Sequence, residues 1–168
     1  MPLFWLFRLL WFTYIQNVSV SEGLGANPVE YVLDYLGLWT LQFLIITLSI
    51  KPILLIFHVP FFEKFPRTLG LYTFFVGSLH TAAYIALEQN FEWGSICMDI
   101  VGRPYITVGL IGFSALMPLA LTSRVAWRNK LGEKKWKNLH RLIYVAGIAG
   151  CMHFVIIRKG FQLEPIPF

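Results

Sequence analysis

The chain has 168 residues, of which 57% are hydrophobic and only 14% are charged, and its formal net charge is +5. Soluble domains carry about 25% charged residues, so this composition excludes an ordinary water-soluble globular protein. The two cysteines, Cys97 and Cys151, lie far apart and belong to no CxxC pair. They therefore indicate neither a disulfide framework nor a zinc site.

Apolar stretches follow one another along the chain at residues 3–15, 36–50, 69–87, 104–121 and 139–157. A membrane-spanning helix needs about 20 mostly apolar residues, and the last three stretches meet that need. The second is short, but it continues past Lys51 and Pro52 to Phe57, and this continuation either completes the crossing or lies along the interface. We therefore expect an all-α, polytopic transmembrane bundle of about five spans, in one domain over residues 1–168.

The first stretch, residues 3–15, is the shortest and contains Arg8. Two interpretations are open, a retained first span or a cleaved signal peptide. A signal peptide has a basic leader before its apolar part and a small-residue cleavage site after it. Neither feature is evident here, so we favour a retained span.

Charges in the loops orient the bundle. The 123–138 loop carries six basic residues and one acid, Glu133, and the 51–68 loop carries three basic residues. The 16–35 loop has three acids and no base, and the 88–103 loop has three acids and one arginine. Basic loops face the cytoplasm, which places the N-terminus in the cytoplasm as well. Because the basic residues lie in short loops and not on one soluble face, we expect no nucleic acid binding.

Two histidines lie deep inside predicted spans. At a helical rise of about 1.5 Å per residue, His80 is about 16 Å and His153 about 21 Å from the cytoplasmic start of its span. Ionisable residues at such depth are usually functional, and imidazole is a common axial ligand of haem iron. The sequence thus predicts that His80 and His153 bind one haem iron from opposite sides. The alternative is that each histidine braces helices or relays protons.

Two further histidines lie near the cytoplasmic boundary. His140 is at the entrance of the last span, about 20 Å below His153, so any iron that it binds is a second one. On an ideal helix the two residues would point about 140° apart, which requires either a distorted helix or haems on different sides. His58 has a similar height and is a weaker candidate ligand for an inner haem, because a solvated loop position explains it equally well.

Several motifs occur in order between Gly25 and Lys159. They are residues 25–28, residues 67–71 leading to His80, residues 103–109, residues 118–123, residues 131–136, residues 139–142 and residues 144–153. In these motifs the chain resembles the MsrQ (YedZ) family. Members of that family are haem-binding membrane subunits of the bacterial periplasmic methionine sulfoxide reductase system, within the ferric-reductase-like transmembrane superfamily.

The resemblance implies a membrane b-type cytochrome with one or two haems, in which His80, His140 and His153 are the haem-associated residues. It also implies that electrons pass from a cytoplasmic flavin reductase or the quinone pool, across the inner membrane, to a periplasmic molybdopterin methionine sulfoxide reductase (MsrP-like) that repairs oxidised proteins. The chain itself would be an electron-transfer subunit without catalytic residues. FMN is associated with the family, but no segment here resembles a flavin-binding fold, so FMN belongs either to this chain or to its cytoplasmic partner.

The chain departs from the family pattern in two places. Family members have six spans, and we expect the last C-terminal span to be absent here. Arg67 occupies the height at which a second inner histidine would lie.

The competing hypothesis is a non-redox membrane protein, either a proton-coupled transporter or a structural anchor subunit. Transporters of that kind carry acidic residues at mid-membrane, and the predicted spans contain no interior Asp or Glu.

Overall fold

The computed structural model describes residues 27–57 and 65–162, and within these residues it contains helices and short turns but no strand. The elements are α3 (Pro28–Phe57), α4 (Phe65–Ala83), the π-helical turn η2 (Tyr84–Glu88), α5 (Trp93–Gly102), α6 (Pro104–Leu121), α7 (Val125–Leu131), α8 (Glu133–His140) and α9 (Leu142–Gln162). The predicted all-α fold is confirmed. The stretch 3–15 and His58 lie outside the described residues.

Four segments are long and apolar enough to cross a membrane: Pro28–Phe57, Phe65–Glu88, Pro104–Leu121 and Glu133–Arg158. They correspond to the last four predicted stretches. The short stretch 36–50 is part of α3, which runs unbroken through Lys51 and Pro52 to Phe57, so its continuation belongs to the same helix. The chain is therefore a multi-pass membrane protein.

The four long helices form two pairs that lie side by side. α3 packs along α4 and α6 packs along α9, whereas contacts between the two pairs are far fewer. Small residues bring the helices of a pair close together. A Cβ added at Gly77 of α4 would lie 3.2 Å from Thr40 of α3, and one at Gly112 of α6 would lie 3.2 Å from Ala149 of α9. Such contacts are typical of helix packing in lipid.

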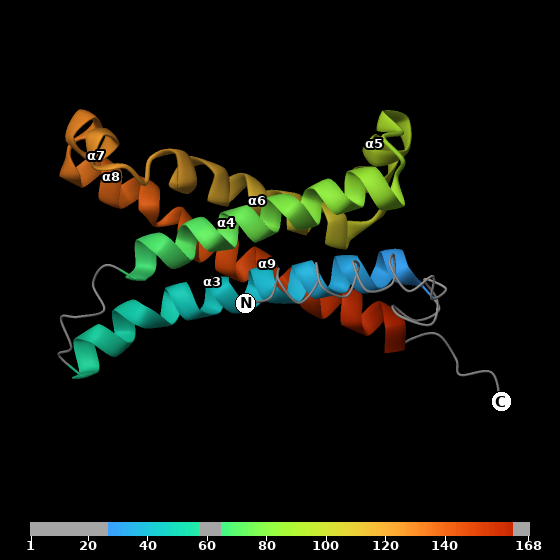
Figure 1. Cartoon of the computed structure of the whole chain (residues 1–168), viewed down its shortest axis with the longest axis horizontal. Helices are drawn as coiled ribbons and strands as arrows, with labels where there is room; N and C mark the ends of the chain where they lie inside the picture. The colour runs from blue at the N-terminus through green and yellow to red at the C-terminus, as the bar shows by residue number, and fades with distance from the viewer. Residues whose placement is uncertain (1–26, 58–64, 163–168) are drawn as a thin grey trace, which may run out of the picture.

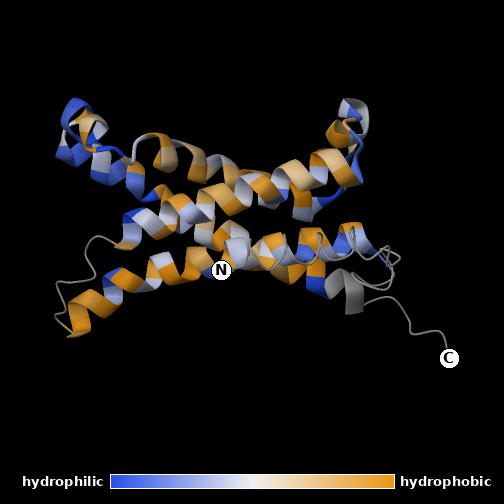
Figure 2. Cartoon of the chain, in the orientation of Figure 1, coloured by the Kyte–Doolittle hydropathy of each residue, from blue (hydrophilic) through white to orange (hydrophobic). Residues whose placement is uncertain are grey.

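Buried residues form two clusters, one between the pairs and one within the α3–α4 pair. One cluster, Leu44, Ala115, Leu116 and Ala146, joins three of the long helices, and a second contains Leu36 and Val76. Many large apolar side chains remain exposed along the long helices. Hydrophobic residues recur along these helices (Figure 2). In a membrane protein these side chains face lipid, which accounts for an exposure that water would not favour.

The short helices lie at the two ends of the bundle. We call the end with α5 and the start of α3 the outer end, and the end with α7 and α8 the inner end (Figure 1). These three helices fall in segments that the sequence analysis assigned to loops. The inner end is strongly basic, and there Glu133 pairs with Arg128 at 3.2 Å and with Lys137 at 2.7 Å.

Candidate functional site

The structure brings His80 and His153 together in the outer half of the bundle. Their ring centroids are 6.2 Å apart, and the ring planes meet at 80°. His80 belongs to α4 and His153 to α9, so each pair of long helices contributes one imidazole. The two residues that depth alone placed at the same height are therefore neighbours in space.

Each imidazole is oriented by a backbone carbonyl of its partner helix. Nδ1 of His80 lies 3.1 Å from the Leu33 carbonyl oxygen of α3, and Nδ1 of His153 lies 2.6 Å from the Tyr105 carbonyl oxygen of α6. Because a carbonyl oxygen only accepts, Nδ1 must carry the proton and donate it. Nε2 then keeps its lone pair, which is the tautomer that a metal-binding histidine needs.

A glycine makes room for each imidazole. Gly37 lies one helical turn after Leu33, and Gly109 lies one turn after Tyr105. A Cβ at Gly37 would lie 3.2 Å from Cε1 of His80, and a Cβ at Gly109 would lie 2.8 Å from Nδ1 of His153. Any larger residue would push the ring away from its carbonyl, so the glycines are part of the site.

The two halves of the site are built in the same way. In each half, a carbonyl and the glycine four residues later lie on the first helix, and the histidine lies on the second. Gly37 precedes His80 by 43 residues, and Gly109 precedes His153 by 44. Buried residues that precede the histidines correspond too: Thr73 and Val76 in α4 match Ala146 and Ala149 in α9 by position.

His140 lies elsewhere, at the inner end. Its Nε2 is 3.2 Å from Oγ1 of Thr122, and its ring stacks on Trp136 with centroids 3.9 Å apart. Trp136 in turn donates from Nε1 to the Thr122 carbonyl oxygen at 3.0 Å. His140 thus belongs to a set of polar contacts that joins α8 to the end of α6. Thr122, where these contacts meet α6, lies about 25 Å along the helix axis from Tyr105.

The helix that carries His140 is interrupted. α8 ends at His140, Arg141 forms a turn, and α9 begins at Leu142. The ideal-helix angle between His140 and His153 therefore does not apply, and the first of the two expected solutions, a local distortion, is present. Arg67 is exposed at the start of α4.

The His80–His153 pair fits an iron ion that already has other ligands. Two imidazoles that hold one metal ion from opposite sides have ring centres roughly 6 Å apart, because each metal–nitrogen bond is about 2 Å long. Among residues 27–57 and 65–162, no group of three or more His, Cys, Asp or Glu side chains lies close enough to hold a metal ion. A porphyrin supplies four nitrogens of its own, so two protein ligands complete a haem iron but not a bare metal ion.

Comparison with known proteins identifies the family of the chain. A family model described as "Ferric reductase like transmembrane component" matches residues 35–151. A protein-methionine-sulfoxide reductase heme-binding subunit MsrQ from Rhodospirillum rubrum is 42% identical over 149 residues, which cover 89% of this chain and 72% of that protein. Its counterpart from Caulobacter vibrioides is 37% identical over 165 residues, which cover 98% of this chain and 74% of that protein.

A longer relative contains a similar segment. The magnetosome protein MamZ of Magnetospirillum gryphiswaldense is 39% identical over 170 residues, which cover 98% of this chain but 26% of that protein. No solved structure matches the chain significantly. Because the family model covers most of this chain, and the MsrQ proteins are similar to it along most of their own length, the chain belongs to the ferric-reductase-like transmembrane family and, within it, to the MsrQ family.

Proposed function

We propose that this chain is a b-type cytochrome of the bacterial inner membrane that delivers electrons to a periplasmic methionine sulfoxide reductase containing molybdopterin. The observation that carries the proposal is the His80–His153 pair, with its 6.2 Å ring separation and both Nδ1 atoms hydrogen-bonded to backbone. The MsrQ relatives are named as heme-binding subunits of a protein-methionine-sulfoxide reductase. In this proposal, one ferric-reductase-like domain extends over residues 1–168.

His80 and His153 would hold the iron of a haem b, and the group would supply a centre that takes up and releases one electron. The chain itself provides orientation and exclusion of water. The Leu33 and Tyr105 carbonyls fix the imidazole planes, and a hydrogen bond from Nδ1 raises the basicity of Nε2 toward the metal. The surrounding apolar helices keep the site dry, which stabilises the state of lower net charge.

His140 would bind a second haem at the inner end, closer to the cytoplasmic electron donor. Its Nε2 lies 3.2 Å from Thr122 Oγ1, so Thr122 would have to release that nitrogen. His58 remains a weaker candidate for the opposite side. The basic helices α7 and α8 at this end suit a cytoplasmic flavin reductase, while a quinol would approach from the lipid. We assign FMN to the cytoplasmic reductase, because the part of the chain that the structure describes has no sheet on which a flavin-binding fold would rest.

The competing function is non-redox: a transporter or anchor in which the histidines relay protons or brace helices. It predicts a protein without haem absorbance, whereas the proposed cytochrome makes two positive predictions. Protein purified in detergent should show the optical spectrum of a low-spin b-type haem that responds to dithionite. Reconstituted in proteoliposomes with reductant inside, it should reduce an external periplasmic methionine sulfoxide reductase. A colourless protein would refute the cytochrome, and a haem protein that fails to reduce the enzyme would refute only the partner.

A further inference from the structure

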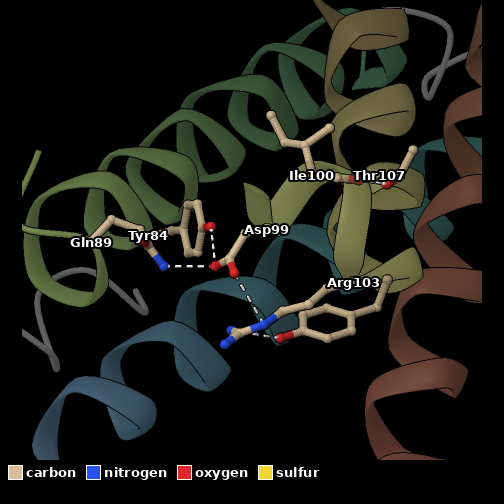
Figure 3. A network of polar contacts seen from close by, with 7 residues as sticks. Tyr84, Gln89, Asp99, Ile100, Arg103 and Thr107 are labelled. Carbon is tan, nitrogen blue, oxygen red and sulfur yellow. Dashed lines mark hydrogen bonds and ion pairs between the residues drawn. The ribbon is translucent and has the colours of Figure 1, made fainter. Parts of the chain in front are cut away.

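A polar network covers the outer end of the bundle, with Asp99 at its centre (Figure 3). Oδ2 of Asp99 accepts hydrogen bonds from the Tyr84 hydroxyl at 2.9 Å and from Nε2 of Gln89 at 2.7 Å. Oδ1 lies 3.2 Å from Nε of Arg103 in an ion pair. The Asp99 side chain is only 13% exposed. Since both oxygens have donors, the burial of this carboxylate is compensated.

One arm of the network reaches the helix that carries His80. Tyr84 lies four residues, or one helical turn, beyond His80, in the π-helical turn that continues α4. Asp99 itself belongs to α5. The Tyr84–Asp99 hydrogen bond therefore ties the outer end of α4 directly to α5.

The other arm reaches the carbonyl that orients His153. Arg103 immediately precedes α6, and its Nη1 donates to the Tyr105 hydroxyl at 3.4 Å. The Tyr105 carbonyl accepts from Nδ1 of His153 at 2.6 Å. The Thr107 hydroxyl also donates to the Ile100 carbonyl, which joins the first turn of α6 to α5 a second time. The Tyr105 carbonyl belongs to the first turn of α6 and points along the helix. These contacts therefore act by fixing where that turn, and with it the carbonyl, lies relative to α5.

The backbone between the two arms adopts unusual conformations. The π-helical turn at residues 84–88 is followed by Asn90 and Phe91, with φ of 46° and 61°. Positive φ is unfavourable for residues with a Cβ, and for a bulky one such as phenylalanine it is a clear outlier. Such conformations persist where the surroundings impose them, often at functional sites. Here they bring Gln89, which is 9% exposed, into contact with Asp99.

We propose that Asp99 is a positioning residue that fixes the mutual placement of the two imidazoles. His80 and His153 come from different helix pairs, and contacts between these pairs are few. Asp99 links the two pairs at the outer end, one turn beyond His80 on one side and through Arg103 to Tyr105 on the other. This inference rests on the proposed function, because the imidazoles act on a haem iron.

The test is electron paramagnetic resonance of the oxidised haem protein, together with its midpoint potential. The g-anisotropy of a low-spin ferric haem with two imidazole ligands depends on the angle between the imidazole planes, and 80° predicts a highly anisotropic signal. In Asp99→Ala we expect haem to remain bound, with a less anisotropic or heterogeneous signal and a shifted potential. Tyr84→Phe, which removes one donor and keeps the ring, should produce a smaller change of the same kind.

Glu92→Gln is the matched control, because Glu92 is an exposed acid at the same end that caps α5 and has no side-chain cap hydrogen bond. It should leave the signal and the potential unchanged. Unchanged spectra and potentials in both Asp99→Ala and Tyr84→Phe would overturn the proposal, as would equal changes in Glu92→Gln. If Asp99→Ala fails to fold, Tyr84→Phe alone decides. A wild-type protein without a low-spin haem signal would instead refute the proposed function.

Discussion

Nδ1 of His153 lies 2.6 Å from the Tyr105 carbonyl oxygen, whereas Nδ1 of His80 lies 3.1 Å from that of Leu33. A shorter hydrogen bond from Nδ1 makes Nε2 a more basic ligand. The two otherwise equivalent halves of the site therefore differ in donor strength, and in the proposed haem site His153 would be the stronger ligand. The free space beside each ring differs as well. A Cβ added at Gly109 would lie 2.8 Å from the His153 ring, and one added at Gly37 would lie 3.2 Å from the His80 ring.

Substitution of the two glycines should accordingly have unequal effects. Gly109→Ala places a Cβ 2.8 Å from Nδ1 of His153, so the imidazole must move, and we expect most of the outer haem to be lost. Gly37→Ala places a Cβ 3.2 Å from Cε1 of His80, a contact that a small shift relieves, so partial retention is expected. Haem per chain, measured as the pyridine haemochrome, decides between these outcomes.

Gly94→Ala is the control for this pair, because Gly94 lies in α5 with nothing within 4 Å of the added Cβ. It should retain full haem content. Full haem content in Gly109→Ala as well would show that the close approach of helix and imidazole is not required.

The orientation of the chain can be tested with a native cysteine. Cys97 is exposed on α5 at the outer end, whereas Cys151 is exposed on the membrane-spanning α9. If the basic loops face the cytoplasm, a membrane-impermeant maleimide should label Cys97 in intact spheroplasts. Cys97→Ser should abolish the labelling and Cys151→Ser should not. Labelling of Cys97 only after the membrane is opened would reverse the topology and the direction of electron flow.

The inner end should be independent of the outer haem. His140 and its partners Thr122 and Trp136 lie about 25 Å from the outer site, so His140→Ala should remove only the inner haem and leave the outer low-spin signal intact. His58→Ala should either convert the inner haem to high spin or change nothing. Loss of the outer haem in either variant, with the inner one retained, would contradict the depths assigned to these residues.

Residue periodicity and hydropathy predicted the long helices well. The span at residues 104–121 coincides with α6, and His80 and His153 were correctly placed at one height. Hydropathy could not reveal α5, α7 and α8, because each is too short to give the signal of a membrane-spanning helix. The predicted span at residues 139–157 falls within one candidate membrane-spanning segment, Glu133–Arg158, in which Arg141 forms a turn between α8 and α9.

The parts of the site that sequence analysis missed are backbone groups and spaces. Leu33 and Tyr105 contribute carbonyl oxygens that every residue possesses, and Gly37 matters only because His80 lies against it. These roles depend on how α3 pairs with α4 and α6 with α9. A sequence pattern along one helix contains no information on that register. Asp99 was visible only as one of the acids that orient the 88–103 loop.

The central claim is that His80 and His153 hold one haem iron between two helix pairs. Haem content and low-spin absorbance of His80→Ala and His153→Ala, purified from the membrane fraction beside the exposed control Met152→Ala, test it most directly. Each histidine variant should insert into the membrane normally and lose the outer low-spin haem, and the control should keep it. Full haem content and an unchanged low-spin spectrum in both histidine variants would contradict the assignment.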